Sequence, residues 1–335
     1  MTRSSTKHTA AIAIAAATVL AGCSSTDNSD SDAGSQAAGY PVTIENTFGE
    51  TTIESAPERI ATLGWNAQDV VYALGETPVG MPRYSYGADE NGVMPWVADR
   101  FDPEATTLLD AETSIPVEQV AGLAPDVVLA PYEGFDEAIY DQLSAFAPTV
   151  AYPDKAWQTT WQDQTTIIGE ALGKSDEADK LVEDLTRQLT DTGAAHPEFA
   201  GKTISVVSIV PDAGAVSVYM PTDPRVQTLT ELGFVNAPGV EKLAESADGK
   251  FYSDISVENI GDIDADVVVA FVPDDRTLTS NPAYANLGAL GRGTVVPLTD
   301  TKVVAGLSQA SVLSTPWVLD KITPQLSEAA TKAGA

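Results

Sequence analysis

The sequence predicts an α/β protein made of two similar lobes that one long helix joins. Short apolar runs typical of buried strands alternate along the chain with longer stretches typical of helices. One helix-strand stretch recurs in similar form 140 residues further on, and a long amphipathic stretch lies between the two copies. The length of 335 residues is enough for two such lobes.

The first lobe begins with a hairpin and continues as alternating strands and helices. The predicted strands are nearly continuous in apolar residues, which favours a parallel sheet covered by helices on both faces. The predicted elements are a hairpin of 42–44 with 51–53, strands at 59–63, 77–80 and 126–130, and helices at 67–74 and 117–123.

The recurring stretch is the main sign of two lobes. Residues 115–130 align with 255–270 without a gap, and seven of the sixteen positions are identical. A weaker similarity precedes each copy, between 69–80 and 226–239, where a helix ends in Leu-Gly. Two copies of one helix-strand unit indicate two lobes of similar construction.

Residues 175–196 are predicted to form the connecting helix, about five to six turns long. Its apolar residues recur at helical spacing and charged residues lie between them. It leads into a new strand at 203–210, and a stiff helix allows less hinge opening than flexible strands would. We expect lobes at 40–174 and 198–335, with the linking helix at 175–197. The apolar positions are Ala178, Leu181, Val182, Leu185 and Leu189.

Charge and composition exclude several functions. There are 48 acidic and 18 basic residues, a formal net charge of −30, which disfavours binding to nucleic acid and direct adhesion to anionic lipid. The only histidines are His8 and His196, so a site for bare zinc or manganese is not expected. Haem is also disfavoured, although a tyrosine-ligated haem stays open.

No enzyme motif stands out, and we predict that the protein is not an enzyme and holds no cofactor. There is no G-x-S-x-G or H-E-x-x-H, and no spare histidine could serve as a base. Residues 169–175 imitate a phosphate-binding loop but have one residue too few between the glycines.

The first 39 residues have the pattern of a secretory signal peptide followed by a flexible tether. Arg3 and Lys7 precede a short apolar run at 10–20, which leads into Leu20-Ala21-Gly22-Cys23. This tetrapeptide resembles a bacterial lipobox, which implies cleavage after Gly22 and lipid attachment to Cys23. We predict a signal peptide at 1–22, a flexible tether at 23–39, and a chain anchored on the outer face of the cell membrane.

Several ordered pieces of the chain resemble one family. They are Pro57-Glu-Arg-Ile60, Ala73-Leu-Gly75 before Pro78-Val-Gly80, Leu232-Gly-Phe234, and a Val-Glu pair before Asp-Val-Val in each lobe. Together with the lipobox, they make the chain resemble the siderophore-type substrate-binding lipoproteins of ABC importers, which bind ferric siderophores, haem or cobalamin. The resemblance covers about residues 42–326.

The resemblance implies two Rossmann-like lobes of the class III periplasmic-binding-protein fold, with the ligand held between them. It also implies a monomer that works with an ABC permease and its ATPase. Glu118 and Glu258 would dock onto permease arginines. Each is predicted near the start of a short helix, where a carboxylate is also favoured by the helix dipole alone.

Ligands of such folds bind where strands end, so large polar or aromatic residues after predicted strands are the candidate contacts. Aromatic faces would pack on an organic chelate, and arginines would donate to its oxygens. Tyr132 and Tyr252 match positions where relatives carry such aromatics. Trp96, Trp157, Trp161 and Trp317 are expected to serve packing. The candidates are Trp65, Arg83, Tyr84, Tyr86, Tyr132, Tyr219, Arg225, Phe251, Tyr252 and Arg276.

These observations predict a protein that captures a ferric siderophore outside the cell and delivers it to an ABC importer. The alternatives are a haem- or cobalamin-type binding protein of the same fold, or a non-transport adhesin or sensor. The residues leave the chelate open among hydroxamate, catecholate and mixed types. The net charge slightly disfavours the strongly anionic catecholates at low salt.

Overall fold

The computed structural model describes residues 39–211, 213–274 and 276–334, which belong to one compact unit, Ala37–Ala335. The predicted signal peptide, Cys23 and all but the last residue of the tether lie outside the described residues. No helix among the described residues has the length and apolar character needed to cross a membrane.

The predicted hairpin is confirmed. Strands β1 (Val42–Asn46) and β2 (Gly49–Ile53) pair antiparallel, with Val42 opposite Ile53. Thr51 anchors the hairpin to lobe one, because its hydroxyl donates to the carbonyl oxygen of Thr149 at 2.6 Å.

Lobe one is built on a five-stranded sheet in the order β5-β4-β3-β6-β7. All four strand pairs are parallel, which confirms the prediction. The strand expected at 77–80 begins only at Gly80. The backbone N–H of Val79 donates to the carbonyl oxygen of Ile60, but Pro78 has no N–H with which to extend the pairing toward residue 77. The strands are β3 (Ile60–Thr62), β4 (Gly80–Pro82), β5 (Thr107–Leu109), β6 (Val127–Leu129) and β7 (Thr149–Val150).

Helices cover both faces of this sheet. Side chains of β6 alternate between two apolar clusters, Val127 and Leu129 in one and Val128 in the other. The continuous apolar run that predicted a buried strand therefore reflects two covered faces. The helices are α1 (Ala67–Ala73), α2 (Val117–Gly122), α3 (Glu137–Ser144) and α4 (Trp161–Ala171).

Lobe two has a mixed sheet, in the order β11-β9-β8-β12-β13, with β10 also paired to β8. The expected parallel sheet is wrong for β9, which runs antiparallel to β8 and β11. The connection between β8 and β9 is too short for a crossover, so the chain turns back as a hairpin. The strands are β8 (Thr203–Ile209), β9 (Ala215–Tyr219), β10 (Val235–Asn236), β11 (Tyr252–Ser256), β12 (Val267–Phe271) and β13 (Val295–Leu298).

The helices of lobe two are mostly short. The second copy of the recurring unit begins with a 3-10 helix, η2 (Val257–Ile263), where lobe one has the α-helix α2. The other helices are η1 (Pro197–Phe199), α6 (Pro224–Glu231), α7 (Pro238–Ala244), α8 (Thr277–Ser280), η3 (Pro282–Asn286), α9 (Gly288–Arg292), α10 (Thr301–Ser308) and α11 (Ser314–Ala333).

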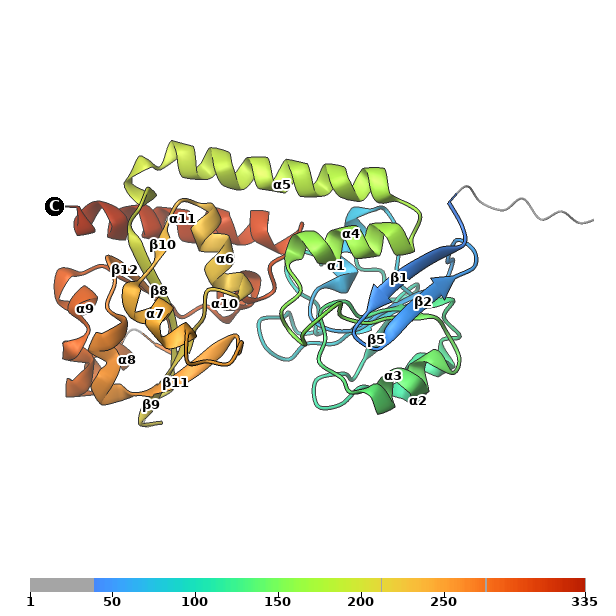
Figure 1. Ribbon diagram of the computed structural model, residues 1–335, viewed down its shortest axis with the longest axis horizontal. Helices are drawn as coiled ribbons and strands as arrows, with labels where there is room; N and C mark the ends of the chain where they lie inside the picture. The colour runs from blue at the N-terminus through green and yellow to red at the C-terminus, as the bar shows by residue number, and fades with distance from the viewer. Residues whose placement is uncertain (1–38, 212, 275, 335) are drawn as a thin grey trace, which may run out of the picture. The chain divides into compact units, whose positions relative to one another are not determined.

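The predicted linking helix is confirmed as α5 (Ser175–Ala195), 21 residues long. It packs against α4 of lobe one and against α6 and η1 of lobe two (Figure 1). Ala178, Leu185 and Leu189 are buried, as their spacing predicts. Gly193 allows close packing, because a Cβ there would lie 2.6 Å from the carbonyl oxygen of Leu232.

The lobes also touch directly, through the segment between α10 and α11. The amide nitrogen of Asn66 in lobe one donates to the carbonyl oxygen of Ala310 at 2.8 Å. The rings of Trp96 and Trp317 lie 5.5 Å apart across the same contact. The arrangement of the lobes thus rests on packed side chains as well as on α5.

Candidate functional site

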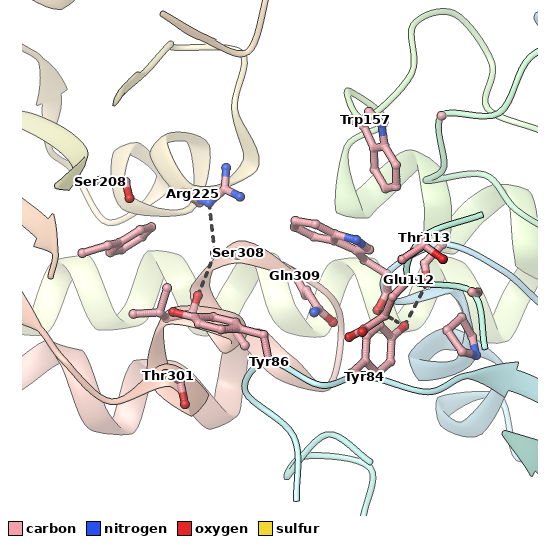
Figure 2. Close-up of a pocket in the computed structure, with 18 of the residues that line it drawn as sticks. Tyr84, Tyr86, Glu112, Thr113, Trp157, Ser208, Arg225, Thr301, Ser308 and Gln309 are labelled. Carbon is pink, nitrogen blue, oxygen red and sulfur yellow. Dashed lines mark hydrogen bonds between the residues drawn. The ribbon is translucent and has the colours of Figure 1, made fainter. Parts of the chain in front are cut away.

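A cavity of about 1400 Å³ lies between the two lobes. Figure 2 shows Arg225 and Ser308 of lobe two on one side of it, and Glu112, Thr113 and Trp157 of lobe one on the other. Its volume exceeds the range of about 300–1000 Å³ common for small-molecule pockets, which suits a bulky ligand better than a bare ion.

Lobe one contributes residues from beyond the carboxyl end of every strand in its sheet. Trp65 follows β3, Arg83 follows β4, Glu112 follows β5, Glu133 follows β6 and Trp157 follows β7. The parallel sheet brings these five connections to one edge, which is where open α/β sheets bind ligands.

The structure brings six of the ten predicted contact residues to the cavity wall. Tyr84 is buried there, and its hydroxyl donates to the carbonyl oxygen of Trp65 at 2.7 Å. Tyr86 is 54% exposed and extends from lobe one toward lobe two (Figure 2). Whether they touch a ligand stays a prediction. The six are Trp65, Arg83, Tyr84, Tyr86, Tyr219 and Arg225.

The other four do not line the cavity. Tyr132 is buried behind the wall, with its ring centroid 6.4 Å from that of Trp65, and burial raises the pKa of its hydroxyl. Phe251 and Tyr252 lie at the start of β11, an edge strand, where Tyr252 pairs with Tyr219 of β9; the two rings are 5.0 Å apart and tilted by 53°. The side chain of Arg276 is 90% exposed beside Asp274.

Arg225 is the buried cation of the site. The backbone turns into α6 at Asp223, whose carboxylate caps the helix by accepting from the Arg225 N–H at 2.9 Å. The same carboxylate holds the Arg225 guanidinium at 2.6 Å, and Ser308 accepts from its Nε at 3.0 Å.

The surroundings keep Arg225 charged and aim it at the ligand space. Burial alone would lower the pKa of Arg225, but the charge of Asp223, with Tyr219 and Tyr132, raises it overall. The guanidinium carbon lies 4.1 Å from the Tyr219 ring centroid. Arginine and tyrosine therefore form one rigid face in lobe two.

Trp157 lines the cavity, although we expected it to serve packing. Its ring lies 5.5 Å from the Trp65 ring and 5.7 Å from that of Tyr132. Its backbone has a φ of +63°, a strained value for a bulky residue. Gly134 makes room for the ring, since a Cβ there would lie 2.2 Å from the Trp157 Nε1. Trp96 and Trp161 are buried, as a packing role requires.

The carboxyl groups of the wall were not predicted from the sequence, and two of them have shifted pKa values. Burial raises the pKa of Glu133 to about 7, although its carboxylate accepts from the Gly134 N–H at 2.8 Å. Glu112 has a lowered pKa, because Ser85 donates to it and Arg83 lies nearby. Each residue follows a predicted or observed strand, but the search for aromatic and basic residues passed over them.

Gln309 at the end of α10 was likewise not predicted. Its side chain is 6% exposed and faces the cavity (Figure 2), and its Oε1 has no hydrogen-bond partner among the described residues. An unpaired buried amide costs about 1–3 kcal/mol, so it is available to a ligand.

Metal ligands do not gather anywhere in the described part of the chain. No group of three or more His, Cys, Asp or Glu side chains there could hold an ion.

The two predicted docking residues lie at equivalent places. Glu118 is in the first turn of α2 and Glu258 in the first turn of η2, and both side chains are exposed. Their helix-terminal position is as expected, and docking itself stays a prediction.

Comparison with known proteins decides the family. Residues 60–301 match the model of the family described as "Periplasmic binding protein". This chain belongs to that family. The resemblance read from the sequence and the expected fold of two α/β lobes joined by a helix are confirmed.

Relatives of this periplasmic binding protein are named for binding siderophores or ferric citrate. The protein named "Probable siderophore-binding lipoprotein YfiY" of Bacillus subtilis (strain 168) is 29% identical over 271 residues, 80% of this chain and 79% of the relative. The Fe(3+)-citrate-binding protein YfmC of the same strain is 26% identical over 294 residues, 85% and 86% of the two chains.

A solved structure agrees with these relatives. Streptococcus pneumoniae TIGR4 PiaA in complex with ferrichrome is similar with a TM-score of 0.80 and 31% identity, over 87% of this chain and 99% of that one. All three are named for binding or appear with a bound ligand.

Proposed function

We propose that this protein captures a ferric siderophore in the cavity between its lobes and delivers it to the permease of an ABC importer. The observation that carries the proposal is the cavity of about 1400 Å³, walled by aromatic rings and two arginines. A chelate that already encloses its iron needs packing surface and hydrogen bonds from the protein rather than metal ligands.

The chemistry of the wall supports binding rather than catalysis. Trp65 and Trp157 offer ring faces to an organic shell, and Arg225 is held ready to donate to chelate oxygens. The relatives are named as siderophore- and ferric-citrate-binding proteins, in line with a binding role for this chain. The protein is proposed to act as a monomer.

Delivery is proposed to use the two lobes together. Glu118 and Glu258 would each meet an arginine of the permease, one from each lobe, so that a loaded protein presents both at once. Lipid attachment at Cys23 would keep the protein on the outer face of the membrane near that permease, with the ATPase acting from the other side.

The proposal is tested by titrating the purified protein with ferric hydroxamates, ferric catecholates, ferric citrate, haem and cobalamin while following tryptophan fluorescence. Trp65 and Trp157 line the cavity, so a ferric chelate should quench their emission at micromolar concentration or below. Quenching by haem or cobalamin alone would refute the siderophore assignment, and no response to any compound would refute the binding role.

A further inference from the structure

The cavity wall carries more carboxylates than cations. The described residues that line it include two arginines, Arg83 and Arg225, and no lysine. They also include Glu112, Glu133 and Asp136, all from lobe one. A site for a strongly anionic ligand would be expected to show the opposite balance.

One of the two arginines is already neutralised by a carboxylate of the chain, and the other has a carboxylate nearby. Arg225 is paired with Asp223 at 2.6 Å, and both side chains are at least 93% buried. Arg83 lies close enough to Glu112 to help lower the pKa of that carboxyl. Arg225 therefore adds no free positive charge to the cavity, and Glu112 offsets the exposed Arg83 only in part. Both arginines can still donate hydrogen bonds.

No cation among the described residues pairs with the other two carboxyl groups of the wall. Glu133 and Asp136 lie on the connection between β6 and α3. The Glu133 carboxylate accepts a hydrogen bond from the backbone N–H of Gly134, and the Asp136 carboxylate accepts one from that of Ile139. Asp136 is exposed and adds a negative charge to the cavity wall. Burial raises the pKa of Glu133 to about 7, so Glu133 adds a second negative charge only as the pH rises above that value.

The polar groups of the wall also include unfilled acceptors. The Oε1 of Gln309 is buried without a partner among the described residues, on the lobe-two side. With the carboxylates of lobe one, it favours a ligand whose surface offers N–H donors.

We infer, on the basis of the proposed function, that this cavity selects ferric chelates of zero or positive net charge, of the tris-hydroxamate class, and discriminates against trianionic ferric tris-catecholates. Three hydroxamates balance the charge of Fe(III), and their amide or ammonium groups supply donors. Three catecholates leave three negative charges, which Asp136 repels, together with Glu133 once its carboxyl is ionised.

The first test compares three chelates on the wild-type protein by tryptophan quenching at pH 8, where Glu133 is mostly ionised. They are ferrichrome, a neutral tris-hydroxamate, ferrioxamine B, a tris-hydroxamate with a free ammonium, and ferric enterobactin, a tris-catecholate. We expect both hydroxamates to bind at least about tenfold more tightly than the catecholate at low salt, with the gap narrowing as salt is added. Equal or tighter binding of the catecholate would overturn the inference while leaving the proposed function intact.

The second test removes the two unpaired carboxylates. Asp136→Asn keeps the helix cap of α3, and Glu133→Gln keeps an acceptor for the Gly134 N–H. In the double variant, the ratio of catecholate to ferrichrome affinity should rise about tenfold or more. Asp136→Asn alone, at an exposed position, should move the ratio in the same direction even if the double variant folds poorly.

A matched control removes two acids far from the cavity wall. Asp179→Asn with Glu183→Gln on α5 changes the net charge by the same amount and should leave the ratio unchanged. An equal rise in the control and the cavity variant, or no rise in either, would overturn the inference. If no chelate quenches fluorescence, the proposed function itself fails.

Discussion

Asp69 and Ser311 share a hydrogen bond of 2.5 Å between the serine Oγ and the carboxylate Oδ2, although 242 positions separate them in the sequence. Asp69 is on α1 of lobe one, and Ser311 is in the link between α10 and α11. Trp96 also donates to the carboxylate, at 2.7 Å, and the side chain is fully buried. One carboxyl group thus ties the second lobe to the first.

This carboxyl should make stability depend on pH. Burial raises the pKa of Asp69 to about 7, although Ser311, Trp96 and Gln68 donate to it and Arg100 is near. Because the folded pKa is above the unfolded one, the folded state binds the extra proton between about pH 4 and 7. The unfolding free energy should therefore fall as pH rises through that window.

Asp69→Asn should remove the contribution of Asp69 to the slope of unfolding free energy against pH, which is at most about 1.4 kcal/mol per pH unit. Urea unfolding of both proteins from pH 4.5 to 8 measures it. Glu133 is raised similarly and remains in the variant, so the slope should shrink rather than vanish. Parallel curves for wild type and Asp69→Asn would contradict the prediction, and the exposed Asp179→Asn serves as the control.

Gly64 should not tolerate a side chain. It has a φ of +83°, and a Cβ there would lie 2.2 Å from the carbonyl oxygen of Tyr132. Gly75 has nearly the same φ, +81°, with nothing within 4 Å. Gly64→Ala should cost about 1–3 kcal/mol more than Gly75→Ala in unfolding free energy.

The same substitution should weaken ligand binding, because it displaces Trp65 next to it. Both variants strain a backbone with positive φ, but only Gly64→Ala makes the close contact with Tyr132. Comparing the two by thermal unfolding and fluorescence titration therefore isolates the effect of that contact on stability and on affinity. Similar losses of stability and affinity in both variants would show that the contact with Tyr132 is unimportant.

Gln309→Leu should stabilise the ligand-free protein and weaken binding. It removes a buried amide whose Oε1 has no partner among the described residues, for a gain of about 1 kcal/mol. Loss of one hydrogen bond to the ligand should lower affinity about fivefold. Gln164 on α4 also has a buried, unpaired Oε1 but does not line the cavity. Gln164→Leu should therefore gain stability and keep its affinity, and equal affinities in both variants would argue against a ligand contact by Gln309.

Glu118→Ala combined with Glu258→Ala should abolish uptake of a ferric chelate and leave its binding unchanged. Both side chains are exposed and neither lines the cavity, so the fold and ligand site should not be affected. Uptake of radiolabelled iron by cells, together with titration of the purified variant, measures the two effects. The pair Asp179→Ala with Glu183→Ala on α5 should leave uptake intact, and reduced ligand binding in the docking variant would mean that the two glutamates are misassigned.

Most of the fold could be predicted because its signals are local. The spacing of Ala178, Leu185 and Leu189 is enough to define α5, and the apolar run at β6 reflects two buried faces. The direction of β9 was missed because it depends on the path of a short connection. Strand order depends on pairings between distant segments, which no single stretch encodes.

The site was predicted only where its residues follow a local rule, the position just after a strand end. Arg225 and Tyr219 follow strand ends, and that rule found them. Trp157 reaches the cavity only because Gly134 leaves room and its own backbone is left-handed, and neither fact is visible in composition or spacing. Tyr132 also follows a strand, but it turns inward and fills space behind Trp65.

The five connections that wall lobe one have a consequence for how such a protein can change its cargo. Each connection leaves a different strand, and the backbone ladder beneath them is complete without any of them. A change of length or composition in one connection therefore alters one patch of the binding surface while the sheet and α5 keep their geometry. Specificity in this scaffold is divided into separate pieces that evolution, or an engineer, can exchange one at a time.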